Sequence, residues 1–195
     1  MDFCDYSSKK RLLRQRAKQT LEALTTSEKE NESRAIVDHL ECELKEIGCS
    51  GIVLIYAALP LEANVSEIIH RRPELTFALP RVLEGSGLLE CRRFADPDSD
   101  LSVGSFQVME PIPERCPLVE TSKLKAIVTP GLSFSKSGAR LGKGGGYYDR
   151  LLENTRGSAR SVGVGFDCQL CQEIPMEKHD RYLDSVITPS GIWHA

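Results

Sequence analysis

Apolar residues in the first fifty positions recur at the spacing of one helix face. This spacing predicts one helix over residues 9–24 and a second over residues 27–47. We expect Thr26 or Ser27 to cap the second helix, because a hydroxyl there can accept from the unpaired amides of the first turn. Gly48 is expected to end it.

Further along the chain, apolar residues gather in short continuous runs separated by Gly, Pro and polar turns. Runs of strand length occupy residues 51–59, 76–79, 88–94, 106–109, 124–128, 161–166 and 180–188, and short helical patterns occupy residues 66–72 and 148–154. Continuous apolar runs are typical of parallel strands covered on both faces. The pattern therefore predicts an α/β fold with a single domain over residues 1–195. Its central sheet is expected to be mostly parallel, with helices on both faces in three α/β/α layers.

The composition changes this picture little but excludes several classes of function. Hydrophobic residues make up 41% of the 195 positions and charged residues 27%, which is ordinary for a globular chain. The net charge of −3 argues against a nucleic-acid-binding protein, and no apolar run approaches the length of a membrane span. Seven cysteines without an export signal indicate reduced thiols. We expect a cytoplasmic monomer that binds neither nucleic acid nor a membrane.

The residues that suggest chemistry are concentrated in residues 128–152. A predicted strand leads through a Pro-Gly break and a polar connection to Arg140 and Lys143. Three consecutive glycines, residues 144–146, follow directly before a predicted helix. A glycine backbone can take positive φ and approach a ligand closely, and a helix N-terminus offers unpaired amides at the positive end of its dipole. With two nearby cations, the stretch predicts a phosphate-binding site.

This loop matches neither of two common nucleotide-binding patterns. A P-loop has four residues between its two glycines, whereas Gly138 and Gly142 enclose three. A P-loop also requires Ser or Thr after its lysine, and Gly144 stands there. A dinucleotide-binding fingerprint requires a third glycine where Tyr147 stands. A flexible surface turn is the alternative interpretation of the three glycines.

Two other clusters carry weaker signals. Cys168 and Cys171 form a lone CxxC, which a zinc site would have to complete with a second pair or with suitably spaced histidines. We interpret them as two half-buried thiols, with zinc or redox chemistry as the less favoured alternative. The acidic run at residues 96–100 is interpreted as a solvated turn rather than a metal site.

The glycine stretch resembles the 5-formyltetrahydrofolate cyclo-ligase family, also called methenyltetrahydrofolate synthetases. The resemblance is carried by residues 130–134 (PGLSF) and residues 140–149 (RLGKGGGYYD). Shorter segments resemble the family in the same order along the chain, namely Lys10–Arg14, Tyr56 and Ala57 with Glu62, Leu79–Arg81, and Asp180 with Asp184. The resemblance therefore covers most of the chain, from residue 10 to residue 188.

The resemblance implies an enzyme of one-carbon metabolism that uses ATP and Mg²⁺. It would convert 5-formyltetrahydrofolate to 5,10-methenyltetrahydrofolate, through phosphorylation of the formyl oxygen and ring closure by N10, with release of ADP and phosphate. The expected catalytic residues are Arg140, Lys143 and Tyr148. ATP is expected at Lys10, Arg11, Leu12, Leu13, Arg14, Arg140, Leu141, Gly142, Lys143, Gly144, Gly145, Gly146, Tyr147 and Tyr148. The folate is expected at Arg14, Tyr56, Ala57, Glu62, Lys143, Gly144, Gly145, Gly146 and Tyr147. The expected magnesium ligands are Asp149 and Asp184.

Several of these side chains also have an ordinary structural interpretation. A helix dipole alone would favour Asp149 in a first turn. Tyr147 and Tyr148 could be packing aromatics, and Glu62 could be an exposed loop carboxylate. The sequence also departs from the family pattern at Asn64, where a carboxylate is usual. This departure bears on substrate affinity and on the preferred length of the glutamate tail, not on the type of reaction.

Two other functions fit the same loop. A small-molecule kinase on this fold would leave a stable phosphorylated product. A non-catalytic nucleotide-binding or regulatory module would bind ATP without turnover.

Overall fold

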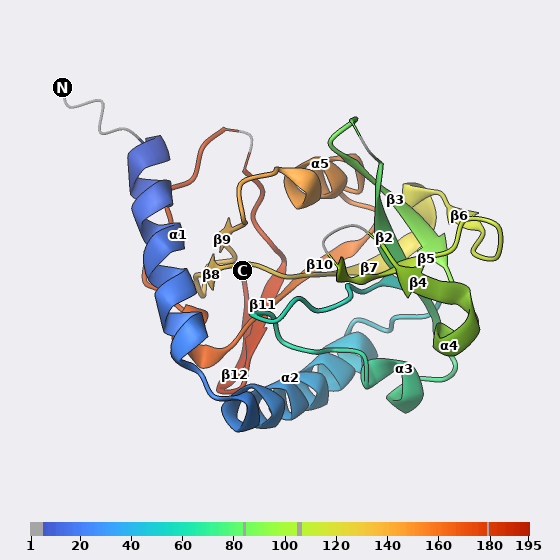
Figure 1. The fold of residues 1–195 in the computed structure, drawn as a ribbon. Coiled ribbons are helices and arrows are strands. Elements are labelled where there is room, and N and C mark those ends of the chain that lie inside the picture. The colour runs from blue at the N-terminus through green and yellow to red at the C-terminus, as the bar shows by residue number, and fades with distance from the viewer. Residues whose placement is uncertain (1–5, 84, 105–106, 179) are drawn as a thin grey trace.

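The computed structural model describes residues 6–83, 85–104, 107–178 and 180–195. Two long helices open the chain, α1 (Tyr6–Ala23) and α2 (Thr26–Glu46), and both agree with the predicted helices to within one turn (Figure 1). The N-cap of α2 is Thr25 rather than the predicted Thr26 or Ser27. Its hydroxyl accepts from the Glu28 amide, and the Glu28 carboxylate accepts from the Thr25 amide at 2.8 Å. This reciprocal pair is a capping box.

An eight-stranded sheet forms the centre of the fold, in the order β12-β11-β10-β7-β1-β2-β3-β6. Its strands are β1 (Ile52–Leu54), β2 (Thr76–Leu83), β3 (Leu88–Arg93), β6 (Leu118–Val119), β7 (Leu124–Thr129), β10 (Arg160–Val164), β11 (Ser185–Thr188) and β12 (Gly191–His194). The five central strands, from β11 across to β2, run parallel. β12, β3 and β6 add antiparallel edges. The prediction of a mostly parallel central sheet is confirmed.

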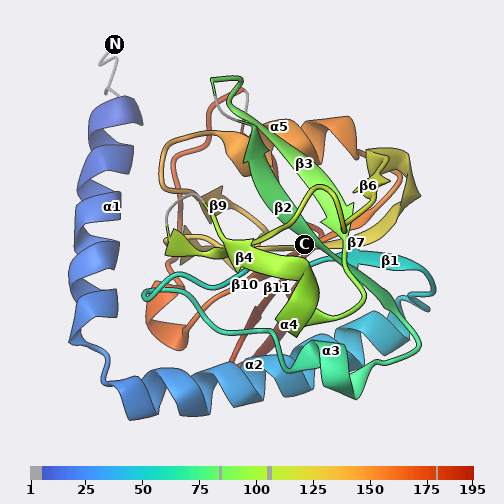
Figure 2. The ribbon, with the colours of Figure 1, turned by 45° about the vertical axis from the view of Figure 1, so that its right-hand side comes forward.

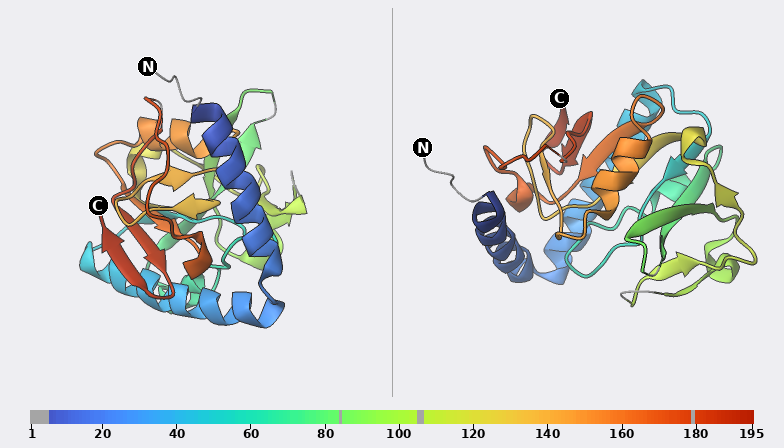
Figure 3. Two further views of the ribbon diagram at one scale, coloured as in Figure 1. Left: turned by 90° about the vertical axis from the view of Figure 1, so that its left-hand side faces the viewer. Right: turned by 90° about the horizontal axis from the view of Figure 1, so that it is seen from above.

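Helices cover both faces of this sheet, as the continuous apolar runs predicted (Figures 1 and 3). On one face lie α2, α3 (Ile68–Arg71) and the second half of α1, and on the other lies α5 (Tyr147–Asn154). Neighbouring residues of one strand enter opposite layers, because Val53 packs in the first cluster and Leu54 in the second. A strand covered on both sides needs apolar residues at consecutive positions.

Smaller elements complete the fold. They are α4 (Pro97–Asp100), the 3₁₀ turns η2 (Thr121–Lys123) and η3 (Asp167–Gln169), and the antiparallel pairs β4 (Leu101–Val103) with β5 (Met109–Pro111) and β8 (Ser133–Phe134) with β9 (Arg140–Leu141). The β4–β5 pair reaches the central sheet through contacts between β5 and β2, and Figure 2 shows β4 in front of this part of the sheet. Among the helices that the structure describes, none combines the length and the apolar composition that a bilayer crossing requires.

Two predicted strands have different bounds in the structure. The run at residues 51–59 is strand only over β1, and its second half leaves the sheet as a loop. By contrast, β2 continues through Pro80, although proline has no amide hydrogen to donate. Pairing with β1 ends at Ala78, so Pro80 faces only Cys91 of β3. The amide hydrogen that Pro80 lacks therefore removes no hydrogen bond between β2 and β1.

Three other predictions need comment. The run at residues 180–188 is strand only over β11, and the final strand β12 was not predicted. The expected polar connection before the glycines contains the β8–β9 hairpin. The predicted strand at 106–109 includes residue 106, which lies outside the described residues, and β5 begins at Met109 instead.

Candidate active site

The carboxyl end of β7 leads into the candidate site. After Thr129 the chain forms the β8–β9 hairpin, and the glycine loop then joins β9 to α5. Gly144 and Gly146 have φ angles of 106° and 67°, in the left-handed region where a side chain would be strained. Gly146 directly precedes the first turn of α5. These conformations explain why glycine stands at both positions.

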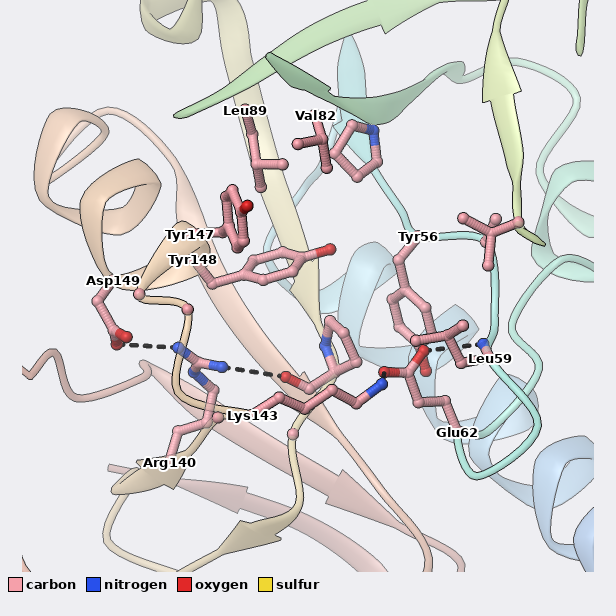
Figure 4. Close-up of a pocket in the computed structure, with 18 of the residues that line it drawn as sticks. Tyr56, Leu59, Glu62, Val82, Leu89, Arg140, Lys143, Tyr147, Tyr148 and Asp149 are labelled. Carbon is pink, nitrogen blue, oxygen red and sulfur yellow. Dashed lines mark hydrogen bonds and ion pairs between the residues drawn. The ribbon is translucent and has the colours of Figure 1, made fainter. Parts of the chain in front are cut away.

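A cavity of about 380 Å³ lies beside this loop (Figure 4). A volume of this order is usual for a small-molecule site. The lining residues are Tyr56, Ala57, Leu59, Glu62, Pro80, Val82, Leu89, Val108, Met109, Glu110, Pro130, Gly131, Arg140, Gly142, Lys143, Gly145, Gly146, Tyr147, Tyr148 and Asp149. The cavity therefore joins the segment after β1 to the glycine loop and the start of α5.

Arg140 is held rigidly at one side of the cavity. Its side chain is only 3% exposed, and its Nη2 donates to Asp149 Oδ1 at 2.9 Å. Its Nη1 donates to the Pro130 carbonyl at 3.2 Å, and its Nε is buried without a partner among the described residues. The guanidinium also lies over the Tyr148 ring, with Cζ 5.6 Å from the ring centroid. The site thus contains a fixed cation with spare donor capacity.

Lys143 and Glu62 connect the two halves of the cavity. The Lys143 ammonium lies 2.6 Å from Glu62 Oε1, and Glu62 Oε2 accepts from the Leu59 amide at 2.9 Å. The Glu62 side chain is 7% exposed, so the interpretation as an exposed loop carboxylate is wrong. Lys143 is 43% exposed and reaches across the cavity from the glycine loop, as Figure 4 shows. The ion pair joins residues 81 positions apart.

Two tyrosines in the cavity wall keep their hydroxyls protonated. Burial raises the pKa of Tyr148, the negative charge of Glu62 adds to the rise, and Arg140 offsets part of it. Burial, and then Glu62, likewise raises the pKa of Tyr56 well above its ordinary value. The Tyr56 hydroxyl donates to the Ala63 carbonyl at 2.6 Å, which stabilises the loop that carries Glu62.

Helix α1 reaches the glycine loop through one side chain. Arg14 Nε donates to the Gly142 carbonyl at 3.0 Å, and the Arg14 guanidinium lies beside Gly144. Leu13 packs against a small cluster that includes Leu141. Arg11 and Leu12 are exposed, and no residue of α1 lines the cavity. Among these expected ATP-binding residues, the structure brings only Arg14 into contact with the loop.

Lys10 lies outside the cavity, and its charge is already neutralised. The residue is 5% exposed, and its ammonium donates to Glu177 Oε2 at 2.7 Å and to the Asp180 carboxylate. Burial lowers the pKa of Lys10, but the hydrogen bonds to Asp180 and Glu177 outweigh burial, so the pKa is raised. This geometry fits a structural role that ties α1 to the segment before β11.

The two expected magnesium ligands lie at opposite ends of the parallel strands. Asp149 lines the cavity beyond the carboxyl end of β7, whereas Asp184 immediately precedes β11. Asp184 Oδ2 accepts from the Ser161 amide and hydroxyl, both at 2.7 Å, and its Oδ1 lies 3.9 Å from Arg160 Nη1. Parallel strands share one direction, so a residue before a strand and a residue after a strand cannot meet at one edge. The structure therefore does not bring these carboxylates to one ion.

Other cavity residues were not predicted as site residues. Val82 and Leu89 form an apolar wall from β2 and β3, and Met109 with Glu110 adds part of β5. Arg81 does not line the cavity, but its Nε lies 3.8 Å from Oε2 of Glu110, which does. No motif marks these residues, because Val82 and Leu89 come together only through the pairing of β2 with β3, and β5 joins them only by contacting β2. Neither Cys168 nor Cys171 joins a group of three potential metal ligands within the described chain.

Comparison with known proteins gives a consistent family. The model of the 5-formyltetrahydrofolate cyclo-ligase family matches residues 6–189. The 5-formyltetrahydrofolate cyclo-ligase of Escherichia coli K12 is 38% identical over 98 residues, which cover 50% of this chain and 54% of that protein. The chain thus spans about half the length of this curated relative. The mouse cyclo-ligase is 28% identical over 194 residues, covering 93% of this chain and 94% of the mouse protein.

Solved structures resemble the whole chain. An NMR structure of 5,10-methenyltetrahydrofolate synthetase from Aquifex aeolicus matches with a TM-score of 0.82 and 26% identity, covering 95% of this chain and 92% of that chain. A synthetase from Mycoplasma pneumoniae matches with a TM-score of 0.75 over 92% of this chain and 98% of that chain. At 21% identity, the second match is evidence for the fold alone.

Proposed function

Because the chain belongs to the 5-formyltetrahydrofolate cyclo-ligase family, we propose that it catalyses the ATP-dependent ring closure of 5-formyltetrahydrofolate. The products would be 5,10-methenyltetrahydrofolate, ADP and phosphate. One observation carries this proposal: Lys143 Nζ lies 2.6 Å from Glu62 Oε1 within one cavity. A cation suited to a phosphate and a carboxylate suited to pterin N–H groups therefore occupy neighbouring positions.

The proposed chemistry turns a poor electrophile into a good one. The formyl group on N5 is amide-like, and its oxygen attacks the γ-phosphorus of ATP. This forms a C–O–P linkage and breaks the bond from the γ-phosphorus to the oxygen that leaves with ADP. N10 then adds to the activated carbon and loses its proton. Cleavage of the C–O bond releases phosphate and leaves the methenyl bridge between N5 and N10.

Phosphoryl transfer depends mainly on positioning and charge neutralisation. We assign the terminal phosphate to Lys143 and to the backbone amides of residues 144–146, where glycine permits close approach. Arg140 is held near the transferred group by Asp149, so little reorganisation is needed as charge develops. The protonated Tyr148 hydroxyl can donate to an oxygen of the substrate. Its ring and that of Tyr147 offer flat surfaces for the pterin.

Mg²⁺ fits the site through one carboxylate rather than two. Asp149 lines the cavity, its side chain is 20% exposed, and its Oδ1 accepts from Arg140. Mg²⁺ usually keeps several waters and needs only one or two carboxylates besides substrate phosphates. When bound, the ion would supply charge neutralisation on the ATP phosphates. We propose Asp149 as its protein ligand.

We also propose that the chain acts as one domain, as a monomer and in the cytoplasm. The cavity is built from a single chain, so no second copy is needed to complete it. All six cysteines in the described part of the chain are free thiols, which suits a reducing compartment.

Product analysis tests the proposed function. Purified protein with 5-formyltetrahydrofolate and Mg-ATP should yield methenyltetrahydrofolate, ADP and phosphate in equal amounts, followed by ultraviolet absorbance and chromatography. Lys143→Met should lower kcat/KM by about 10²–10³-fold if the ammonium meets developing charge. Lys136→Met is the matched control, because Lys136 is exposed and lies over the Trp193 ring, outside the cavity. A stable phosphorylated metabolite would indicate a kinase, and ATP binding without turnover would indicate a regulatory module.

A further inference from the structure

A buried carboxylate lies at the opposite end of the parallel strands from the cavity. Glu43 of α2 is fully buried, and its Oε1 accepts from the hydroxyl of Ser185, the first residue of β11, at 2.7 Å. Its Oε2 is buried and has no hydrogen-bond partner among the described residues. No lysine or arginine of the described chain forms an ion pair with it. A buried carboxylate oxygen is costly unless a cation or donor meets it.

Two exposed side chains lie beside the Glu43 carboxylate. His194 of β12 has Nε2 3.8 Å from Glu43 Oε2. Glu46 lies one turn further along α2, and one ligand atom from each of these three residues falls within 4.8 Å of the others. An imidazole and two carboxylates thus converge beside a buried oxygen that has no hydrogen-bond partner among the described residues.

We propose that Glu43, Glu46 and His194 form a zinc-binding site. Zinc bonds of about 2.0–2.2 Å in tetrahedral geometry separate neighbouring ligand atoms by about 3.4 Å. The distance of 3.8 Å between Glu43 and His194 is already close to this value. The other two ligands are exposed, so small side-chain rotations can complete the site. A water would take the fourth position.

The surroundings suit a bound transition ion. Borderline nitrogen and oxygen ligands without a thiolate are compatible with Zn²⁺, which lies near the top of the affinity order for divalent ions. The Ser185 hydroxyl fixes the Glu43 carboxylate, as outer hydrogen bonds commonly orient metal ligands. The ion would tie the edge strand β12 to α2, so its expected effect is on stability.

The test is a titration of the full-length, tag-free protein with Zn²⁺ and separately with Co²⁺, without substrates. We expect one equivalent of Zn²⁺ to bind by calorimetry and to raise Tm by about 5 °C or more at saturating metal. His194→Gln and Glu46→Gln should each weaken binding at least tenfold. Both residues are exposed, so these variants should fold. His70→Gln, on exposed His70 of α3, is the matched control and should bind like the wild type.

A second arm separates this site from the cysteines. Cys168→Ser should leave the stoichiometry unchanged, and the Co²⁺ form should lack the charge-transfer absorption of a thiolate ligand. The proposal is overturned if the wild type binds no stoichiometric Zn²⁺. It is equally overturned if binding survives His194→Gln and Glu46→Gln but disappears in Cys168→Ser. Because no substrate is present, these outcomes are independent of the enzymatic assay.

Discussion

The Lys143–Glu62 ion pair predicts that ATP and folate help each other bind. Lys143 Nζ and Glu62 Oε1 form an ion pair at 2.6 Å. ATP would draw Lys143 to its phosphate and leave Glu62 unpaired, and folate alone would leave Lys143 unpaired. With both ligands bound, both residues have new partners. Each ligand binding alone has to break the ion pair, but when one ligand is already bound the second finds it broken. The first ligand therefore raises the affinity for the second.

The size of this coupling follows from the burial of the pair. An exposed ion pair contributes about 0.2–1 kcal/mol, and loss of one partner from a buried pair costs about 3–5 kcal/mol. Glu62 is 7% exposed and Lys143 is 43% exposed, so the pair lies between these limits. A contribution of about 1–2 kcal/mol corresponds to a change of roughly 5- to 30-fold in affinity.

Calorimetry measures the coupling directly. A non-hydrolysable ATP analogue is titrated into protein with and without saturating 5-formyltetrahydrofolate, and the wild-type affinity should rise roughly 5- to 30-fold with folate present. Glu62→Gln should reduce this ratio toward one, while Lys136→Met, which alters a lysine outside the cavity, should preserve it. If Glu62→Gln retains the full ratio, the ion pair is not the coupling element and the reasoning is refuted.

Further predictions concern Lys10, Gly146 and Tyr148. Lys10→Met should lower the free energy of unfolding in urea by about 3 kcal/mol, because it removes the buried ammonium that pairs with Asp180 and Glu177; unchanged stability would contradict the structural role. The folded-state pKa of Lys10 is raised, so its contribution should be complete below the unfolded pKa and disappear as pH rises through the folded value in alkaline unfolding curves. Gly146 has a φ of 67°, so Gly146→Ala should lower the free energy of unfolding by about 1 kcal/mol and weaken the binding of an ATP analogue. Unaltered binding would mean that the loop does not hold phosphate. Because the pKa of Tyr148 is raised, the plots of kcat/KM against pH for the wild type and for Tyr148→Phe should have the same shape up to about pH 10. A fall in kcat/KM in this range that only the wild type shows would mean that the hydroxyl ionises, contrary to the prediction.

Local patterns predicted the framework of this protein well. Consecutive apolar residues such as Val53 and Leu54 indicated a strand covered on both faces, and they do enter opposite clusters. The glycines before α5 indicated a tight backbone turn, and Gly144 and Gly146 adopt positive φ. Glu62 and the glycine loop both follow carboxyl ends of parallel strands, which is the edge where ligands collect in such sheets. Their ion pair agrees with that rule.

Partners far apart in the sequence were beyond local patterns. A lysine side chain is suited to binding phosphate, but the ammonium of Lys10 is paired with Glu177 and Asp180, which approach it only in the folded chain. The wall residues Val82 and Leu89 depend on the register of β2 with β3.

For Asp184, the start of the following strand decides at which edge of the sheet the residue lies. A residue just before a parallel strand lies at the amino edge, away from the ligand-binding edge. The predicted strand began at residue 180, but β11 begins at Ser185. Asp184 therefore lies just before the strand, at the edge of the sheet away from the cavity.

Transfer of the formyl oxygen to phosphate is the central claim, and isotope labelling tests it most directly. 5-Formyltetrahydrofolate carrying ¹⁸O in its formyl group is incubated with the protein and Mg-ATP, and the released inorganic phosphate is analysed by mass spectrometry. Attack of that oxygen on the γ-phosphorus predicts one ¹⁸O in each phosphate formed. Phosphate that carries no label, with methenyl product still accumulating, would contradict the account.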